Sequence, residues 1–164
     1  MKTKKLTTIA LLSSLALILG FIEGQFVIIP ACPGIKLGLS NTAVMFTLLF
    51  MDKKSAYSIA VLKALFAFAT RGIMAGILSL SGGLVSISVI LIILLLNKNT
   101  SFASLSITGA LFHNLAQFTV IHIVYRGASF LPYLPLLIVS GIVFGVMNAL
   151  LLKTTFPYLK KVIK

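Results

Sequence analysis

The chain has 164 residues, of which 59% are hydrophobic, and its mean hydropathy is +1.14. A soluble domain cannot bury so much apolar surface, so the composition indicates an integral membrane protein. The net charge of +12 would suggest nucleic-acid binding in a soluble protein. Here the basic residues lie at the ends of apolar segments, where membrane topology explains them, so we expect no nucleic-acid partner.

The apolar segments predict an all-α bundle of six transmembrane helices that forms a single membrane domain, residues 1–164. A spanning helix needs about 20 residues, so this length leaves no room for a separate catalytic domain. Residues 25–34 contain two prolines and are too short to span, so they form either a lid over a cavity or a plain connector. The helices are predicted at 6–22, 37–51, 55–70, 73–96, 102–125 and 133–152, and a basic tail follows.

The distribution of basic residues predicts the orientation of the bundle. With the N-terminus inside, the outer ends of the helices carry only Lys36, Arg71 and Arg126. The inner ends carry ten lysines: Lys2, Lys4, Lys5, Lys53, Lys54, Lys98, Lys153, Lys160, Lys161 and Lys164. The positive-inside rule therefore predicts a multi-pass protein of the cell membrane with both termini in the cytoplasm.

Lys63 lies in the third predicted helix, about 12 Å from its inner end. A cation at this depth costs about 2.5 to 3.5 kcal/mol on insertion scales, so it normally faces the bundle interior or a cavity. The only two acidic residues, Glu23 and Asp52, fall at the outer end of the first helix and in an inner loop. We therefore expect an anionic or strongly hydrogen-bonding ligand to act as the counter-ion. The alternative is that Lys63 extends toward the inner headgroups.

Other polar residues gather in the outer half of the predicted bundle. Arg71 is only about 80° round the helix from Lys63, and the polar cluster of the fifth helix spans about 100° of arc. The candidate substrate-binding residues are Lys63, Arg71, Lys36, Asn41, His113, Asn114 and Gln117.

Each of these features also has a structural interpretation. The cluster on the fifth helix could form interhelical hydrogen bonds, and the outer cations could be interfacial anchors. Ser81-Gly82-Gly83 is interpreted as a close helix crossing rather than a ligand contact.

The residue types exclude several chemistries. The chain has no GxxxxGK[ST] motif, so it holds no phosphate loop for ATP. Two acidic residues cannot supply the paired carboxylates that hold Mg²⁺ on a diphosphate or carry out acid–base catalysis. One cysteine and two histidines nine residues apart make a poor metal site. We expect no catalytic residue, metal or cofactor, and proton-coupled transport through His113 is disfavoured because it has no intramembrane carboxylate.

Four blocks, KKLTTIALLSSLALILGFIE, PGIKLGLSN, LKALFAFATRGIMAGILSLSGGLVS and GALFHNLAQ, resemble the Gx-transporter family, also catalogued as heptaprenyl diphosphate synthase component I. The layout is similar to substrate-binding S-components of energy-coupling factor transporters. This resemblance implies a membrane protein that captures a substrate and works with a separate coupling subunit and ABC-type ATPases. Since the predicted site is positively charged, we expect a small anionic or polar molecule, captured from the outer side. Ala10 and Ser14 fall where S-components carry an alanine-xxx-alanine docking pattern, and the serine departs from it; ordinary helix packing within the chain is the alternative.

The catalogue name implies a different function. Prenyl-chain synthesis uses aspartate-rich motifs to hold Mg²⁺ and diphosphate, and Asp52 is the only aspartate. The chain therefore lacks the residues of a prenyltransferase. The alternative function is that of a non-catalytic membrane subunit of a heptaprenyl diphosphate synthase, isoprenoid-quinone or redox assembly.

Overall fold

The computed structural model describes residues 2–25, 37–125 and 131–163, and six α-helices account for most of them. The helices are α1 (Lys2–Gln25), α2 (Leu39–Phe50), α3 (Lys53–Arg71), α4 (Ile73–Leu96), α5 (Phe102–Val124) and α6 (Leu134–Ile163), with a short 3-10 turn, η1 (Leu131–Tyr133), before α6. Four segments are long and apolar enough to cross a membrane: 3–25, 73–96, 102–124 and 131–158. The protein is therefore a helical membrane protein.

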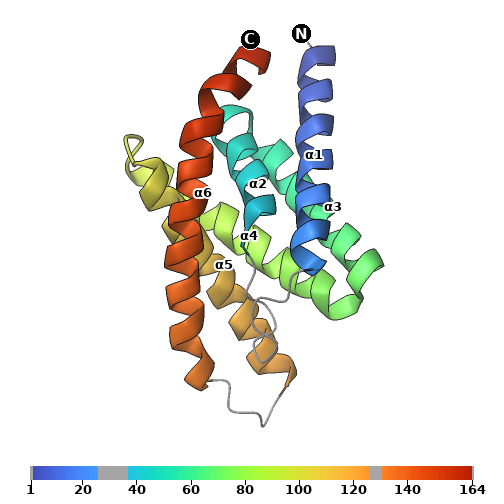
Figure 1. Cartoon of the computed structure of the whole chain (residues 1–164), viewed down its shortest axis with the longest axis vertical. Helices are drawn as coiled ribbons and strands as arrows, with labels where there is room; N and C mark the ends of the chain where they lie inside the picture. Colours follow the sequence, from blue (N-terminus) through green and yellow to red (C-terminus); the bar gives the residue numbers. More distant parts are fainter. Residues whose placement is uncertain (1, 26–36, 126–130, 164) are drawn as a thin grey trace.

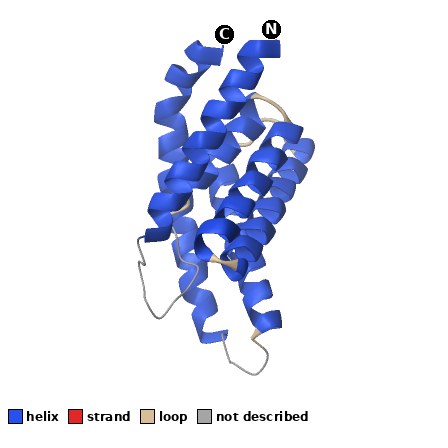
Figure 2. Ribbon diagram, turned by 90° about the vertical axis from the view of Figure 1, so that its right-hand side faces the viewer, coloured by secondary structure: helices blue, strands red, loops and turns tan. Residues whose placement is uncertain are grey.

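The helices form one bundle in which the first and last helices run side by side at one end (Figure 1). The helix α1 packs against α2 and α3, and the helices from α3 to α6 pack against one another in chain order. Both ends of the chain lie at the same end of the bundle, as the turned view also shows (Figure 2). We call this the terminal end.

A side-chain cap and a glycine mark where α3 and α4 begin. Asp52 caps α3 by accepting from the backbone N–H of Ser55 and from its hydroxyl, each at 2.8 Å, and it pairs with Lys5 of α1 at 2.9 Å. The backbone hydrogen bond, followed by the bond to Lys5, lowers the pKa of Asp52 from 3.8 to about 2. Gly72 joins α3 to α4 with φ of 89°, a conformation that other residues rarely adopt.

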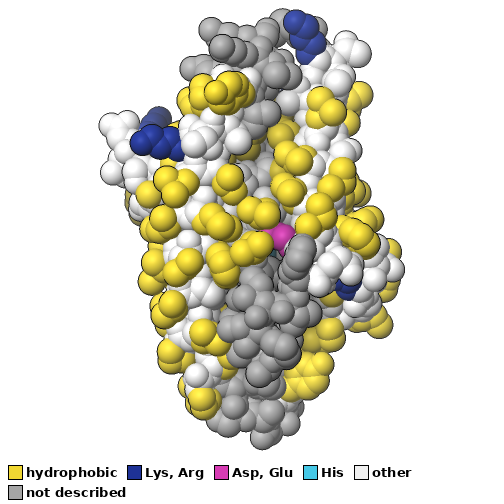
Figure 3. All heavy atoms as spheres, in the orientation of Figure 1, with side chains coloured by type: hydrophobic (Ala, Val, Ile, Leu, Met, Phe, Trp, Pro, Cys, Tyr) yellow, Lys and Arg dark blue, Asp and Glu magenta, His cyan; other side chains and the backbone are white. Residues whose placement is uncertain are grey.

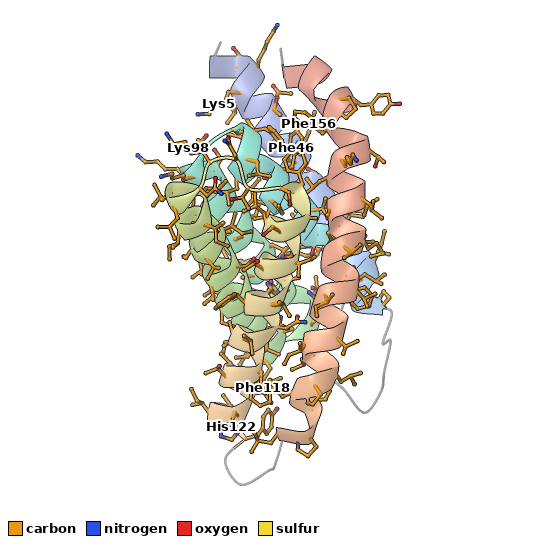
Figure 4. The ribbon with its side chains drawn as sticks, turned by 90° about the vertical axis from the view of Figure 1, so that its left-hand side faces the viewer. Lys5, Phe46, Lys98, Phe118, His122 and Phe156 are labelled. Atoms are coloured by element: carbon orange, nitrogen blue, oxygen red, sulfur yellow. The ribbon has the colours of Figure 1, made fainter. Side chains whose placement is uncertain are left out.

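The apolar core lies in the half of the bundle nearer the terminal end. Its largest fully buried apolar side chains are Phe46, Ile59, Leu105 and Leu152, from four different helices. Beside them the rings of Phe50 and Phe156 pack with centroids 4.4 Å apart. Figure 4 shows Phe46 and Phe156 near the terminal end, together with Lys5 and Lys98.

Large apolar side chains also cover the outside of the bundle, as expected for a surface in contact with lipid. Leu11 on α1, Leu96 on α4 and Leu150 on α6 are all exposed. On the face shown in Figure 3, hydrophobic side chains extend along most of the described length.

The helices differ in length from their predictions, chiefly at the ends. α4 has its predicted bounds, and α5 ends one residue earlier than predicted. α1 is longer than 6–22, because lysines and a glutamate continue a helix beyond the apolar stretch, whereas α2 is shorter than 37–51. α3 starts at Lys53 rather than Ser55, because Asp52 acts as its cap. α6 continues to Ile163, where 133–152 was predicted, and in this extension Phe156 packs against Phe50.

Candidate functional site

A cavity lies between the apolar core and the end of the bundle opposite the termini, and all six helices contribute to its wall. The empty space, counted together with its open mouth, is about 840 Å³. Its polar lining residues are Glu23, Ser40, Asn41, Thr42, Lys63, Arg71, Ser79, Ser86, Ser106, His113, Asn114, Gln117, Ser140 and Asn148. The apolar ones are Leu37, Met45, Ile90, Ala110 and Phe144.

Lys63 points into this cavity from the middle of α3. Its side chain is only 6% exposed, and Nζ donates to Ser40 Oγ at 3.3 Å and to Asn41 Oδ1. Both acceptors lie in the first turn of α2, which begins toward the opposite end of the bundle. The alternative in which Lys63 reaches the headgroups of the terminal end is therefore wrong.

Glu23, near the end of α1, is 4% exposed and joins the same network. Its carboxylate accepts from the N–H of Leu39, from the N–H of Ser40 at 3.4 Å, and from Ser40 Oγ at 2.9 Å. α2 starts after Gly38, which has φ of 74° and supplies no side-chain cap. Glu23 thus caps α2 from a neighbouring helix, and a negative charge is favourable at that position.

This arrangement corrects the expectation that no carboxylate lies close to Lys63. The Ser40 hydroxyl contacts both the Glu23 carboxylate and the Lys63 ammonium. The error arises because α1 extends to Gln25, so Glu23 is part of the helix and its side chain turns inward. The counter-charge is therefore partly supplied by the protein itself.

His113 and Gln117 lie one turn apart on α5 and face α4. Gln117 Nε2 donates to the carbonyl of Leu78 at 3.3 Å and lies 3.2 Å from His113 Nε2. The carbonyl accepts only from the amide nitrogen, so this contact fixes the orientation of the Gln117 amide. Nε2 of His113 is then the acceptor, which puts the proton of the neutral ring on Nδ1.

The glycines of α4 make room for these neighbours. A Cβ at Gly82 would lie 2.6 Å from Cε1 of His113, and one at Gly83 would lie 3.4 Å from Cβ of Ala60. α5 and α3 therefore approach α4 closely on either side of this step. The interpretation of Ser81-Gly82-Gly83 as a close helix crossing is confirmed.

Two asparagines tie α6 to the rest of the cavity wall. Asn114 Nδ2 donates to the carbonyl of Leu137 at 3.0 Å and to Ser140 Oγ at 3.4 Å. Asn148 Nδ2 donates to the carbonyl of Gly38 at 3.2 Å, and its Oδ1 accepts from Thr42 Oγ1 at 3.0 Å. The predicted interhelical hydrogen bonding is confirmed for Asn114, and both asparagines also line the cavity.

Arg71 closes α3 at the end of the cavity away from the termini. Its guanidinium lies against α1, where a Cβ at Gly24 would be 2.7 Å from Nη1. Its Nε is buried and has no hydrogen-bond partner among the described residues. The same is true of Oε1 of Gln117.

Six of the seven candidate residues thus line one cavity, namely Lys63, Arg71, Asn41, His113, Asn114 and Gln117. The seventh, Lys36, lies outside the described residues, as do Arg126 and the proposed lid apart from Gln25, which ends α1. Glu23, Ser40 and Asn148 were missing from the candidate set. The serines of α4 were missed too, although Ser79 and Ser86 are seven residues apart and so share one helix face.

Within the described ranges, no group of three or more His, Cys, Asp and Glu residues could hold a metal ion. Neither a curated protein nor a solved structure matches the chain. A family model described as heptaprenyl diphosphate synthase component I matches residues 12–155, which is well over half of the sequence. The chain therefore belongs to the heptaprenyl diphosphate synthase component I family.

Proposed function

We propose that this chain is the substrate-binding subunit of a membrane uptake system, and that its cavity captures a small anionic or polar molecule from the outer side. The observation that carries the proposal is a cavity with many polar and charged side chains in its wall, inside an apolar bundle, to which every described helix contributes. Polar and charged side chains are costly within a membrane, and they normally mark a substrate pathway there. Helix packing alone accounts for some of these groups, but not for an open polar space.

In this proposal the described lining residues have distinct roles. Lys63 and Arg71 provide positive charge, while Asn41, His113, Asn114 and Gln117 provide hydrogen bonds. Lys36, which lies outside the described residues, is proposed as a third cation. Glu23 and Ser40 hold Lys63 in position.

The proposed topology is a six-span bundle resembling an energy-coupling factor S-component, in the cell membrane with both termini in the cytoplasm. Both ends of the chain lie at one end of the bundle, which requires an even number of crossings (Figure 1). α3 has 19 residues and is about 28 Å long, close to the hydrocarbon thickness. α2 has 12 residues and is the shortest of the six proposed crossings.

The proposed partners are a coupling subunit and ABC-type ATPases, because the chain has no phosphate loop. Ala10 and Ser14 are exposed on α1, where another helix can approach them. Ala16 is fully buried and packs within the bundle instead. The exposed pair is the proposed docking position.

The test is ligand binding by the purified chain in lipid nanodiscs. Small molecules retained after gentle purification are identified by mass spectrometry, and their affinities are measured for the wild type, Lys63→Met and Lys98→Met. We expect Lys63→Met to weaken binding at least tenfold while membrane insertion is unchanged. Lys98 is exposed in a turn away from the cavity, so Lys98→Met should bind normally. Equal binding by all three would remove Lys63 from the site.

The family description favours a second function, that of a non-catalytic subunit of an isoprenoid assembly. The polar and charged side chains in the wall argue against a prenyl chain inside the cavity, since buried polar groups need hydrogen-bond partners. Affinity purification from native membranes separates the two functions. Recovery of an ATPase pair supports uptake, whereas stoichiometric recovery of a soluble prenyl synthase supports the accessory role.

A further inference from the structure

The chemistry of the ligand can be inferred from atoms of the cavity wall that lack partners. Gln117 is 3% exposed, and its Oε1 has no hydrogen-bond partner in the described part of the chain. The Leu78 carbonyl holds the amide nitrogen, so the oxygen cannot exchange places with it. A buried acceptor of this kind is costly unless a bound molecule supplies a donor.

Arg71 needs a hydrogen-bond acceptor, whereas Gln117 needs a donor. Its Nε–H is buried, and within the described ranges nothing accepts its hydrogen bond. The one described carboxylate in the wall, that of Glu23, accepts from Leu39 and from both donors of Ser40, and not from Nε of Arg71. Arg71 therefore needs a further acceptor, and an oxyanion suits a guanidinium best.

The charges of the lining residues also favour an anionic ligand. Among the described lining residues, two cations, Lys63 and Arg71, accompany the single carboxylate of Glu23. Lys63 donates to Ser40 and Asn41 in this wall. A bound oxyanion would balance the remaining positive charge.

We propose that the cavity binds a small amphoteric molecule, whose oxyanion accepts from Nε–H of Arg71 and whose N–H or O–H group donates to Oε1 of Gln117. This inference rests on the proposed function and defines its substrate class. We expect no long hydrocarbon chain in such a ligand, because it would leave Nε–H of Arg71 and Oε1 of Gln117 without partners. The two contacts together select molecules that carry both groups.

The experiment uses the full chain in nanodiscs and a panel of small compounds in four matched sets. The first set holds heterocyclic and amino carboxylates with an N–H donor, and the second holds the same compounds as methyl esters, without the anion. The third holds the carboxylates with every N–H of the donor nitrogen replaced by N-methyl, and the fourth holds prenyl diphosphates. Binding is measured by thermal shift and then by calorimetry.

We expect compounds of the first set to bind at least tenfold more tightly than their esters or N-methylated forms. Arg71→Lys, which keeps the charge but lacks Nε–H, should reduce the preference over the esters. Gln117→Met should abolish the preference over the N-methylated forms. Thr119→Val, a change at an exposed position on the same helix, should preserve both preferences.

The outcomes separate failure of the amphoteric ligand class from failure of the proposed substrate-binding function. If esters or N-methylated compounds bind as well as their parents, the amphoteric class is wrong although the cavity binds solutes. Preferences that survive Arg71→Lys and Gln117→Met would also overturn it, provided that the variants melt like the wild type without ligand. If no set binds, or only prenyl diphosphates bind, the proposed function itself fails.

Discussion

The carboxylate of Glu23 lies between the end of α1 and the start of α2, buried with three hydrogen bonds from Leu39 and Ser40. Glu23→Gln removes the negative charge and turns an amide N–H₂ toward groups that are themselves donors. We expect it to destabilise the protein by about 1–3 kcal/mol, the cost of leaving such groups unsatisfied. Thermal unfolding in detergent measures this.

Asp52→Asn is the matched control, because it neutralises the other acidic residue of the chain. The Asp52 side chain is 30% exposed, so solvent screens its pair with Lys5. The lowering of the melting temperature should therefore be smaller than for Glu23→Gln. An equal or larger effect would show that Glu23 is not the more important helix cap.

Asp52 also predicts a pH dependence at the terminal end. Its pKa is about 2 in the folded protein against a usual 3.8, so the folded state favours the carboxylate. The resulting stability is complete above about pH 4 and is lost as the pH falls toward about 2. The difference in melting temperature between wild type and Asp52→Asn should shrink over this range. A difference that stays constant from pH 5 to pH 2.5 would contradict the cap and the ion pair.

At the level of the helices, the close approach of α5 and α3 to α4 can be tested by two alanine substitutions, Gly82→Ala and Gly83→Ala. Alanine stabilises a helix by about 1 kcal/mol relative to glycine. At Gly82 the new methyl would overlap the His113 ring, with 2.6 Å between Cβ and Cε1, whereas at Gly83 it would meet Ala60 at 3.4 Å. Overpacking costs about 1–3 kcal/mol.

We therefore expect Gly82→Ala to lower the melting temperature and Gly83→Ala to leave it unchanged or raise it slightly. Thermal unfolding of the two variants side by side checks this. Gly82→Ala should also weaken ligand binding, because it displaces the imidazole from the cavity wall. If the two variants melt alike, the α4–α5 approach described above is wrong.

The helices also show what the sequence can predict. Hydropathy locates all six, because apolar runs broken by charged or glycine-containing turns leave few alternatives. Charged helix ends are harder to predict, since lysines and Glu23 continue a helix as readily as they end it. The candidate cavity residues were found through the cost of polar groups in a membrane, which singles out Lys63 and Gln117. Glu23 was missed because its inward direction depends on the packing of α2 against α1, which periodicity does not reveal.

For the whole molecule, the arrangement of the ends predicts topology. The described lysines Lys5 and Lys98 lie near the terminal end, and Phe118 and His122 lie at the other (Figure 4). Since cytoplasmic ends carry the excess of basic residues, the terminal end should face the cytoplasm. The turn at Asn99 should then be inside, and Tyr125 at the end of α5 should be outside.

Single cysteines test this in a Cys32→Ser background, placed so that no basic residue is changed. In intact cells a membrane-impermeant maleimide should label Tyr125→Cys but not Thr3→Cys or Asn99→Cys, which should react only after permeabilisation. Labelling of Thr3→Cys and Asn99→Cys in intact cells, with Tyr125→Cys protected, would show that the protein has the opposite orientation in the membrane. The cavity, which lies toward the end opposite the termini, would then face the cytoplasm, and capture from outside would be excluded even if the ligand binds as proposed.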